Sequence, residues 1–176
     1  MNRARVLLAA IVAGALAVGA YFVWRPSDES RIRAQLERLA VAVRIQDADA
    51  QANPIARLAH VNGEVDALFE PEARVNVPEL TDLGSGHASR RELAELVAGA
   101  PRYVKTFDVG FGSVTIKMDD ARTTAFVGAI AKVNVVQRDG AVDRGERAVD
   151  VHFARNDGTW VIRTLTVWSP EDAPAR

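Results

Sequence analysis

Few side chains in this sequence have the types and spacing that acid–base chemistry requires. Asp150 and His152 lie two positions apart, so on a β-strand both point to one face, where the carboxylate could orient the imidazole. The same pair can also be interpreted as part of an exposed ion cluster on the outside of a sheet. His60 directly precedes Val61 on a predicted helix, which makes it either a candidate general base or a residue at the edge of the buried face.

The sequence contains no recognisable metal-binding or nucleophile motif. His87 stands in a Gly- and Ser-containing loop without a second His or acid at ligand spacing, and the chain has no Cys. Phosphate-binding loops, serine-hydrolase elbows and zinc-protease motifs are absent from it as well. With 22 Lys plus Arg against 23 Asp plus Glu, the net charge of −1 provides no basic field for a nucleic acid. We therefore expect no metal, no cofactor and no nucleic-acid partner.

The clearest signal is an apolar segment near the N-terminus. Every residue of Val6–Trp24 is apolar or Gly except Tyr21, and Arg3 and Arg5 precede the segment. A helix of this length rises about 28 Å, which just spans the hydrocarbon core of a bilayer. We expect residues 6–24 to be a transmembrane signal-anchor that contacts the membrane. A cleaved signal peptide is the alternative, because Val18-Gly19-Ala20 offers small residues at a cleavage position.

Such an anchor places the domain that follows it outside the cytoplasm. Only three of the basic residues are Lys and Ala is abundant, a pattern typical of GC-rich coding that suggests a bacterial source. The predicted organisation is a tail and signal-anchor over 1–26, one domain over 27–170 and a tail over 171–176. The predicted location is the bacterial inner membrane, crossed once, with the domain facing the periplasm or the exterior.

The domain begins with helices and ends with strands, which predicts an α+β fold. Apolar residues at helical spacing predict one helix over 27–46, a second from Pro54 until Pro71 closes it, and a third from Ser89 to Pro101. Alternating residues predict a short strand over 73–78 and four long strands, which cover 103–118, 121–137, 146–156 and 159–168. Hairpin turns join the long strands, so we expect an antiparallel meander with the helices on one face.

The hairpins also predict which side chains face inward. A two-residue turn at Asp119-Asp120 would pair Met118 with Ala121 and place Val127 on the small, apolar inner face. The strand before this turn has its apolar residues out of phase with that face. A β-bulge at Gly112-Ser113 would restore the phase.

The same alternation extends this inner face to the last hairpin. It places Phe153, Trp160 and Thr164 inside. In the first long strand it places Phe107 inside, whereas Asp108 would point inward only if the bulge were absent.

Three groups of short motifs occur in a characteristic order. Leu68-Phe69-Glu70-Pro71 precedes the short strand, Gly86 and Arg91-Glu92-Leu93 open the next helix, and Asp157-Gly158-Thr159-Trp160-Val161-Ile162 forms the closing hairpin. With these motifs the domain resembles the nuclear transport factor 2-like superfamily, which includes SnoaL-like polyketide cyclases and ketosteroid isomerases. The resemblance covers about residues 28–168.

The resemblance implies a cone, in which three helices pack on the concave face of a strongly curved antiparallel sheet around an apolar pocket. The inward-facing residues that would line this pocket are Phe107, Val127, Phe153, Trp160 and Thr164. Tyr103 and Asp108, near the mouth of the cone, are similar in type to the catalytic residues of the isomerases, and with His60 they are the candidate catalytic residues.

The opposite, convex face is a candidate interface. It presents Phe126 and Ile130 four positions apart on one strand face, together with the polar side chains of His152 and Arg163. Apolar residues ringed by charge have the layout of a modest self-complementary contact. Domains of this superfamily often dimerise through that face, so we expect a homodimer, and an envelope protein is the alternative partner.

The fold does not by itself assign a function, because the same cone serves as an enzyme, a ligand binder or a dimerisation platform. An inner face without a buried acid favours a non-catalytic module that assembles with a partner or binds a small apolar ligand. An isomerase, cyclase or dehydratase of the SnoaL-like kind is the alternative.

We predict that residues 27–176 lie outside the cytoplasm, because Arg3 and Arg5 precede the apolar segment. A reporter that needs an oxidising compartment, fused after Arg176, should therefore be active. Activity of a cytoplasmic reporter alone at the same position would reverse this orientation.

Overall fold

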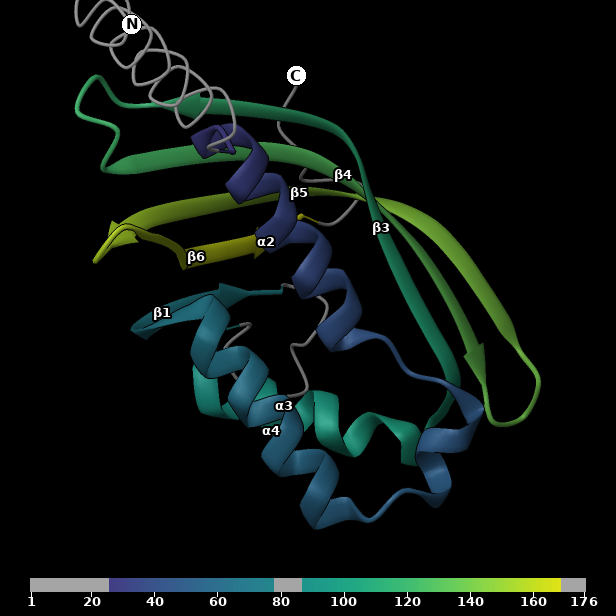
Figure 1. Ribbon diagram of the computed structural model, residues 1–176. Coiled ribbons are helices and arrows are strands. Elements are labelled where there is room, and N and C mark those ends of the chain that lie inside the picture. Colours follow the sequence, from purple (N-terminus) through teal and green to yellow (C-terminus); the bar gives the residue numbers. More distant parts are fainter. Residues whose placement is uncertain (1–25, 78–86, 169–176) are drawn as a thin grey trace, which may run out of the picture. The chain divides into compact units, whose positions relative to one another are not determined.

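The computed structural model describes residues 26–77 and 87–168. Within these ranges it contains three α-helices, which are α2 (Asp28–Val43), α3 (Pro54–Leu68) and α4 (Arg90–Gly99). Two short 3₁₀ helices, η1 (Asp47–Gln51) and η3 (Ala100–Arg102), lie in the connections. The predicted α+β class with three helices is confirmed (Figure 1).

Each α-helix begins at a side-chain cap. The hydroxyl of Ser27 accepts from the N–H of Ser30 at 3.1 Å, and Asn53 Oδ1 accepts from the N–H of Ile55 at 2.9 Å. Ser89 and Glu92 form a reciprocal capping box, in which the Ser89 N–H donates to the Glu92 carboxylate at 2.7 Å. That backbone hydrogen bond holds the pKa of Glu92 below its usual value.

Six strands form one sheet in the described ranges, in the order β2-β1-β6-β5-β4-β3. Their bounds are β1 (Phe69–Asn76), β2 (His87–Ser89), β3 (Val104–Met118), β4 (Thr124–Gln137), β5 (Val142–Asn156) and β6 (Thr159–Val167). The long strands β3, β4 and β5 bend strongly along their length (Figure 1). The expected all-antiparallel sheet is wrong at one pair, because β1 runs parallel to β6.

Some predicted element boundaries are wrong. The first helix stops at Val43 rather than residue 46, because Ile45 instead pairs its backbone with Phe107 at the edge of β3. Ile55, in the first turn of α3, is 80% exposed although it is apolar. Pro71 lies inside β1 rather than closing a helix, and the pairing of β1 with β6 is irregular there, so no regular ladder needs its missing N–H.

The register of the β3–β4 hairpin differs from the predicted one, but its side chains face the predicted sides of the sheet. Met118 lies opposite Ala125 rather than Ala121, because residues 119–123 form a longer loop. The carboxylate of Asp119 holds this loop by accepting hydrogen bonds from Thr123 and Thr124, and the bond from the Thr123 hydroxyl is the main reason why the pKa of Asp119 falls to about 2. The shift is four residues, an even number, so Ala125 still faces inward.

The predicted bulge in β3 is confirmed. The register of β3 against β4 shifts between Gly112 and Thr115, and Ser113 has a left-handed backbone with φ of 49°. Val109 before the bulge and Ile116 after it both pack on the same core. The side chain of Asp108 consequently points away from that core and pairs with Arg44 at 2.7 Å.

A second bulge, in β6, overturns one predicted placement. Phe153 lies opposite Ile162 whereas His152 lies opposite Thr164, so Arg163 is the extra residue in β6. Trp160 and Ile162 face the core as expected, but beyond the bulge the buried residue is Leu165. The inward placement of Thr164 is therefore wrong, and its side chain lies on the His152 face.

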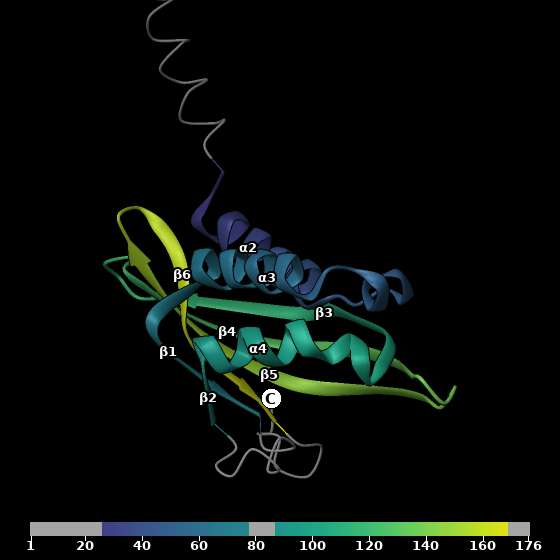
Figure 2. The same cartoon turned by 90° about the horizontal axis from the view of Figure 1, so that it is seen from below.

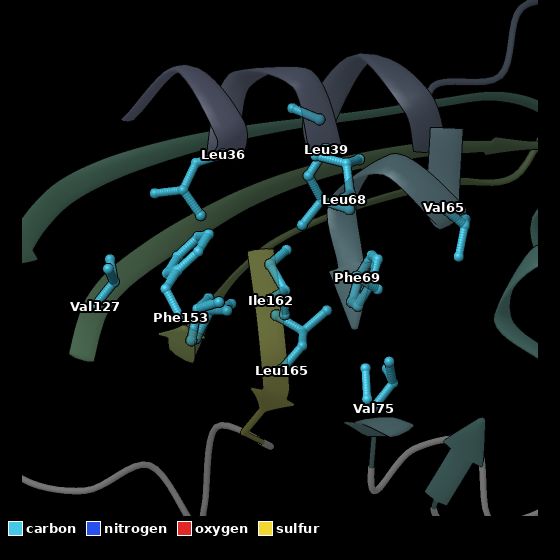
Figure 3. Close-up of a cluster of buried hydrophobic side chains, with 14 of the residues drawn as sticks. Leu36, Leu39, Val65, Leu68, Phe69, Val75, Val127, Phe153, Ile162 and Leu165 are labelled. Atoms are coloured by element: carbon cyan, nitrogen blue, oxygen red, sulfur yellow. The ribbon is translucent and has the colours of Figure 1, made fainter. Parts of the chain in front are cut away.

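The core lies between the helices and the concave face of the sheet. Leu36 and Leu39 of α2 and Leu68 of α3 point toward Phe153 and Ile162 of the strands (Figure 3). Ion pairs also join the helices to one another. Arg38 of α2 contacts Glu64 of α3 at 2.7 Å, and Arg90 of α4 contacts Asp66 of α3 at 3.1 Å. In Figures 1 and 2, α3 lies next to both of these helices.

No helix within residues 26–77 and 87–168 is long and apolar enough to cross a bilayer. The predicted span over residues 6–24 and the predicted tail over 171–176 lie outside these ranges. Every described core residue lies at or after Ile32, so a fragment of residues 27–176 retains all of them.

We predict that replacing Trp160 by Ala lowers the free energy of unfolding of residues 27–176 by about 3–5 kcal/mol, because the side chain is 1% exposed. Urea denaturation measures this difference. Tyr103→Ala is the matched control, since Tyr103 is 76% exposed and its loss should cost about 0.5 kcal/mol or less. Equal midpoints for the two variants would contradict the inward placement of Trp160.

Candidate functional site

The main candidate site is an apolar cavity of about 490 Å³ on the concave side of the sheet. Helices α2 and α4 and strands β1, β3, β4, β5 and β6 contribute to its wall. Of its 22 described lining residues, two carry a charge. Its volume lies in the range of small-molecule sites, about 300–1,000 Å³. The apolar wall residues include Leu39, Val43, Leu93, Val97, Phe107, Val109, Val133, Val135 and Leu165.

The two charged lining residues, Asp143 and Arg147, both come from β5. Asp143 lies opposite Val135 and Arg147 lies opposite Ala131, both of which face the cavity. Gly145 lies between them on the same face, opposite Val133. The side chain of Arg147 is half-buried and that of Asp143 is exposed.

Asp143, Gly145 and Arg147 were not among the predicted site residues. The predicted strand begins at residue 146, whereas β5 begins at Val142. The signal that could have found them is the alternation of Val149, Val151 and Phe153 extended toward the N-terminus in steps of two.

The predicted pocket residues divide between the cavity and the closed core. Phe107 lines the cavity. Val127, Phe153 and Trp160 are at most 1% exposed and pack where helices close over the sheet, away from the cavity wall. Thr164 lies on the opposite face.

The three candidate catalytic residues do not line the cavity. Tyr103 lines a separate pocket beside α4, together with His87 and Glu92. Asp108 is exposed beside Arg44, and His60 is exposed on α3. The structure therefore does not bring these candidates together around one space.

The four candidate interface residues lie at two different places on the outer face of the sheet. Phe126, which is 38% exposed, lies edge-on to the ring of His152, with the centroids 4.9 Å apart. Ile130 is half-buried on the same face of β4.

Arg163 instead forms a two-bond contact with Glu70 of β1. The guanidinium donates to the two carboxylate oxygens at 3.0 and 3.3 Å. Chiefly because of these hydrogen bonds, the pKa of Glu70 lies below its usual value.

Asp150 and His152, the possible acid–base pair, contact different side chains. Asp150 accepts a hydrogen bond from the indole Nε1 of Trp168 at 2.8 Å, and His152 packs against Phe126. Across residues 26–77 and 87–168, no group of three or more His, Asp or Glu side chains is arranged to hold a metal ion.

Solved structures similar to this one share its fold. The hexachlorocyclohexane dehydrochlorinase LinA-type3 from Novosphingobium barchaimii superposes with a TM-score of 0.61 at 12% identity, over 84% of this chain and 89% of that one. A nuclear transport factor 2-like superfamily protein from Salmonella enterica superposes with a TM-score of 0.58 at 16% identity, over 79% of this chain and 88% of that one. Aln2 from a Streptomyces species superposes with a TM-score of 0.57 at 18% identity, over 83% of this chain and 94% of that one.

Comparison of the sequence with protein-family models and with curated proteins gives no match. The structural likeness shows that the domain has the nuclear transport factor 2-like fold, a curved six-stranded sheet with three helices. At these identities the likeness concerns the fold alone, and the function must be argued from the cavity.

Proposed function

We propose that this protein is a non-catalytic module that binds small apolar molecules and is held at the bacterial inner membrane. The observation that carries the binding role is the cavity of about 490 Å³, whose wall is apolar except for Asp143 and Arg147. Transfer of an apolar molecule from water into such a space is favourable at roughly 25 cal/mol for each Å² buried. The anchor is the segment over residues 6–24, with residues 27–170 on the periplasmic or outer side.

The chemistry of the wall favours binding over catalysis. A SnoaL-like isomerase, cyclase or dehydratase needs an acid or base in contact with the bound molecule. Tyr103, Asp108 and His60 lie outside the wall, and Asp143, which is on it, is exposed. An enzyme with Asp143 as its base remains the alternative function, and the similarity in fold to a dehydrochlorinase is what supports considering it.

We also propose that the protein is a homodimer that assembles through its outer sheet face. Phe126, the aromatic residue of β4, is 38% exposed, and Asp150 lies on the same sheet face, opposite Gly128 two residues away. A membrane anchor would raise the effective concentration of the domains and favour even a small contact. An envelope protein that covers this face is the alternative partner.

Saturable binding of the neutral dye N-phenyl-1-naphthylamine to residues 27–176 is the expected result, with a dissociation constant of roughly tens of micromolar. Dye fluorescence measures the affinity. Val135→Phe should weaken binding at least about tenfold, because Val135 lines the cavity and the larger ring would occupy it. Val136→Phe is the matched control, since Val136 faces the other side of β4. Equal affinities for the two variants would rule the cavity out as the binding site.

Sedimentation velocity should show residues 27–176 as a dimer at roughly tens of micromolar. Phe126→Asp should give a folded monomer, because it places a charge at the centre of the proposed contact. Tyr103→Asp introduces the same charge at an exposed aromatic residue outside that face and should leave the dimer intact. A wild-type fragment that stays monomeric at about 1 mM would exclude this assembly.

A further inference from the structure

Helix α4 forms one wall of the cavity, and few of its side chains are buried. Ala94 alone among its ten residues is buried, whereas α2 has four buried residues and α3 has three. Leu93, Leu96 and Val97 are half-buried and line the cavity with part of their surface. Side chains that face a cavity lack contacts on that side. Packing therefore fixes the position of α4 less firmly than that of the other two helices.

Polar contacts hold α4 at both of its ends. At its start, Arg90 contacts Asp66 of α3 at 3.1 Å. At its end, the chain continues directly into η3, in which Pro101 is buried. The carbonyl oxygen of Pro101 accepts two hydrogen bonds from Arg138, one from Nε at 3.1 Å and one from Nη2 at 3.0 Å. Carbonyls at the end of a helix have no partner within the helix, so Arg138 supplies one.

The same guanidinium ties this end of α4 to two other walls of the cavity. Its Nη1 donates to Asp47 Oδ1 at 2.9 Å, and Asp47 lies two residues after the lining residue Ile45. Arg138 itself directly follows β4, three residues after the lining residue Val135. The planar fork of an Arg can hold a carbonyl and a carboxylate in one fixed geometry, which the point charge of a Lys cannot.

We propose that Arg138 is a positioning residue for ligand binding, which holds α4 away from β4 and β5 and so keeps the cavity open. Without this tie, α4 would move toward the sheet, because its half-buried Leu and Val side chains would gain contacts there. The apolar surface buried by this movement would offset the loss of the Arg138 hydrogen bonds. This inference rests on the proposed binding function and adds the residue on which the open form of its site depends.

The test measures affinity and stability on the full chain in lipid nanodiscs. The neutral probe 4-phenylbutan-1-ol is titrated calorimetrically, with empty nanodiscs as the blank, and urea denaturation measures the stability. Arg138→Gln should lower the affinity for the probe at least about tenfold, the size expected when hydrogen bonds from a charged group are lost. The same variant should leave the urea midpoint nearly unchanged, whereas a merely structural role would lower both quantities together.

Arg163→Gln is the matched control. Arg163 is not among the described residues that line the cavity, and it donates to the Glu70 carboxylate at 3.0 and 3.3 Å. Its substitution therefore also removes one charge and two hydrogen bonds, and it should keep the wild-type affinity whatever its effect on the urea midpoint. Arg138→Lys, which keeps the charge but not the fork, should weaken binding too, and it serves as the second variant if Arg138→Gln does not fold.

A distance measurement tests the position of α4 without a ligand. Because the chain has no Cys, Glu95→Cys on α4 and Arg144→Cys on β5 provide two unique sites for nitroxide spin labels. Both residues are exposed, so the labels should not disturb the core. Samples are diluted with unlabelled protein, so that distances between protomers do not contribute. Double electron–electron resonance should give a shorter distance between the labels when Arg138→Gln is added.

The outcomes separate this inference from the binding function. An unchanged affinity or an unchanged label distance in Arg138→Gln would overturn the inference, while binding by the wild type would leave the binding function standing. A loss of affinity in Arg138→Gln that is matched by an equal loss in Arg163→Gln would also overturn it. If the wild type binds neither the alcohol nor the neutral dye, the binding function itself fails and the inference fails with it.

Discussion

The structure depends on keeping one face of a long, bent strand apolar from end to end. In β3 the apolar residues Phe107, Val109 and Phe111 occupy odd positions before the bend, while Val114 and Ile116 occupy even positions after it. A regular strand would send one of these sets to solvent. The extra residue at Ser113 reverses the alternation, so both sets contribute to one core, and the same irregularity bends the strand.

Because the sheet curves, its concave face serves two different roles along its length. Under the helices, Val127, Phe153 and Trp160 are completely buried and stabilise the fold. Toward the β4–β5 turn, the same face carries Val133 and Gly145, and here it forms the wall of the cavity. The core and the cavity wall thus use different residues of the same strands, so the cavity end can vary in sequence with little cost to the core.

Local signals predict most of the elements, and long-range contacts explain what they miss. The starts of the second and third helices, at Pro54 and Ser89, and the bulge at Gly112-Ser113 depend on neighbouring residues alone, and all three were predicted to within one residue. The parallel pairing of β1 with β6 depends on residues about 90 positions apart, and no periodicity within either strand encodes it.

The site was predicted less well than the fold, for a similar reason. The bulge at Arg163, which turns Thr164 outward, accompanies a contact with Glu70 of another strand. The cavity residues Asp143 and Gly145 were missed because the predicted strand begins at residue 146, whereas the chain already pairs in a strand from Val142. Alternation predicts which face a side chain lies on, but which part of that face remains open depends on how far the helices extend over it.

The β3 bulge also affects whether the exposed edge of the sheet can pair with a strand of another molecule. β3 is the last strand of the described sheet, so its outer edge presents backbone groups that could recruit a strand from another molecule. Ile45 already pairs with this edge at Phe107, and the left-handed turn at Ser113 interrupts it further along. The charges of Lys105 and Lys117 flank these two points. The residue that bends the strand around its core therefore also protects the domain from edge-to-edge aggregation.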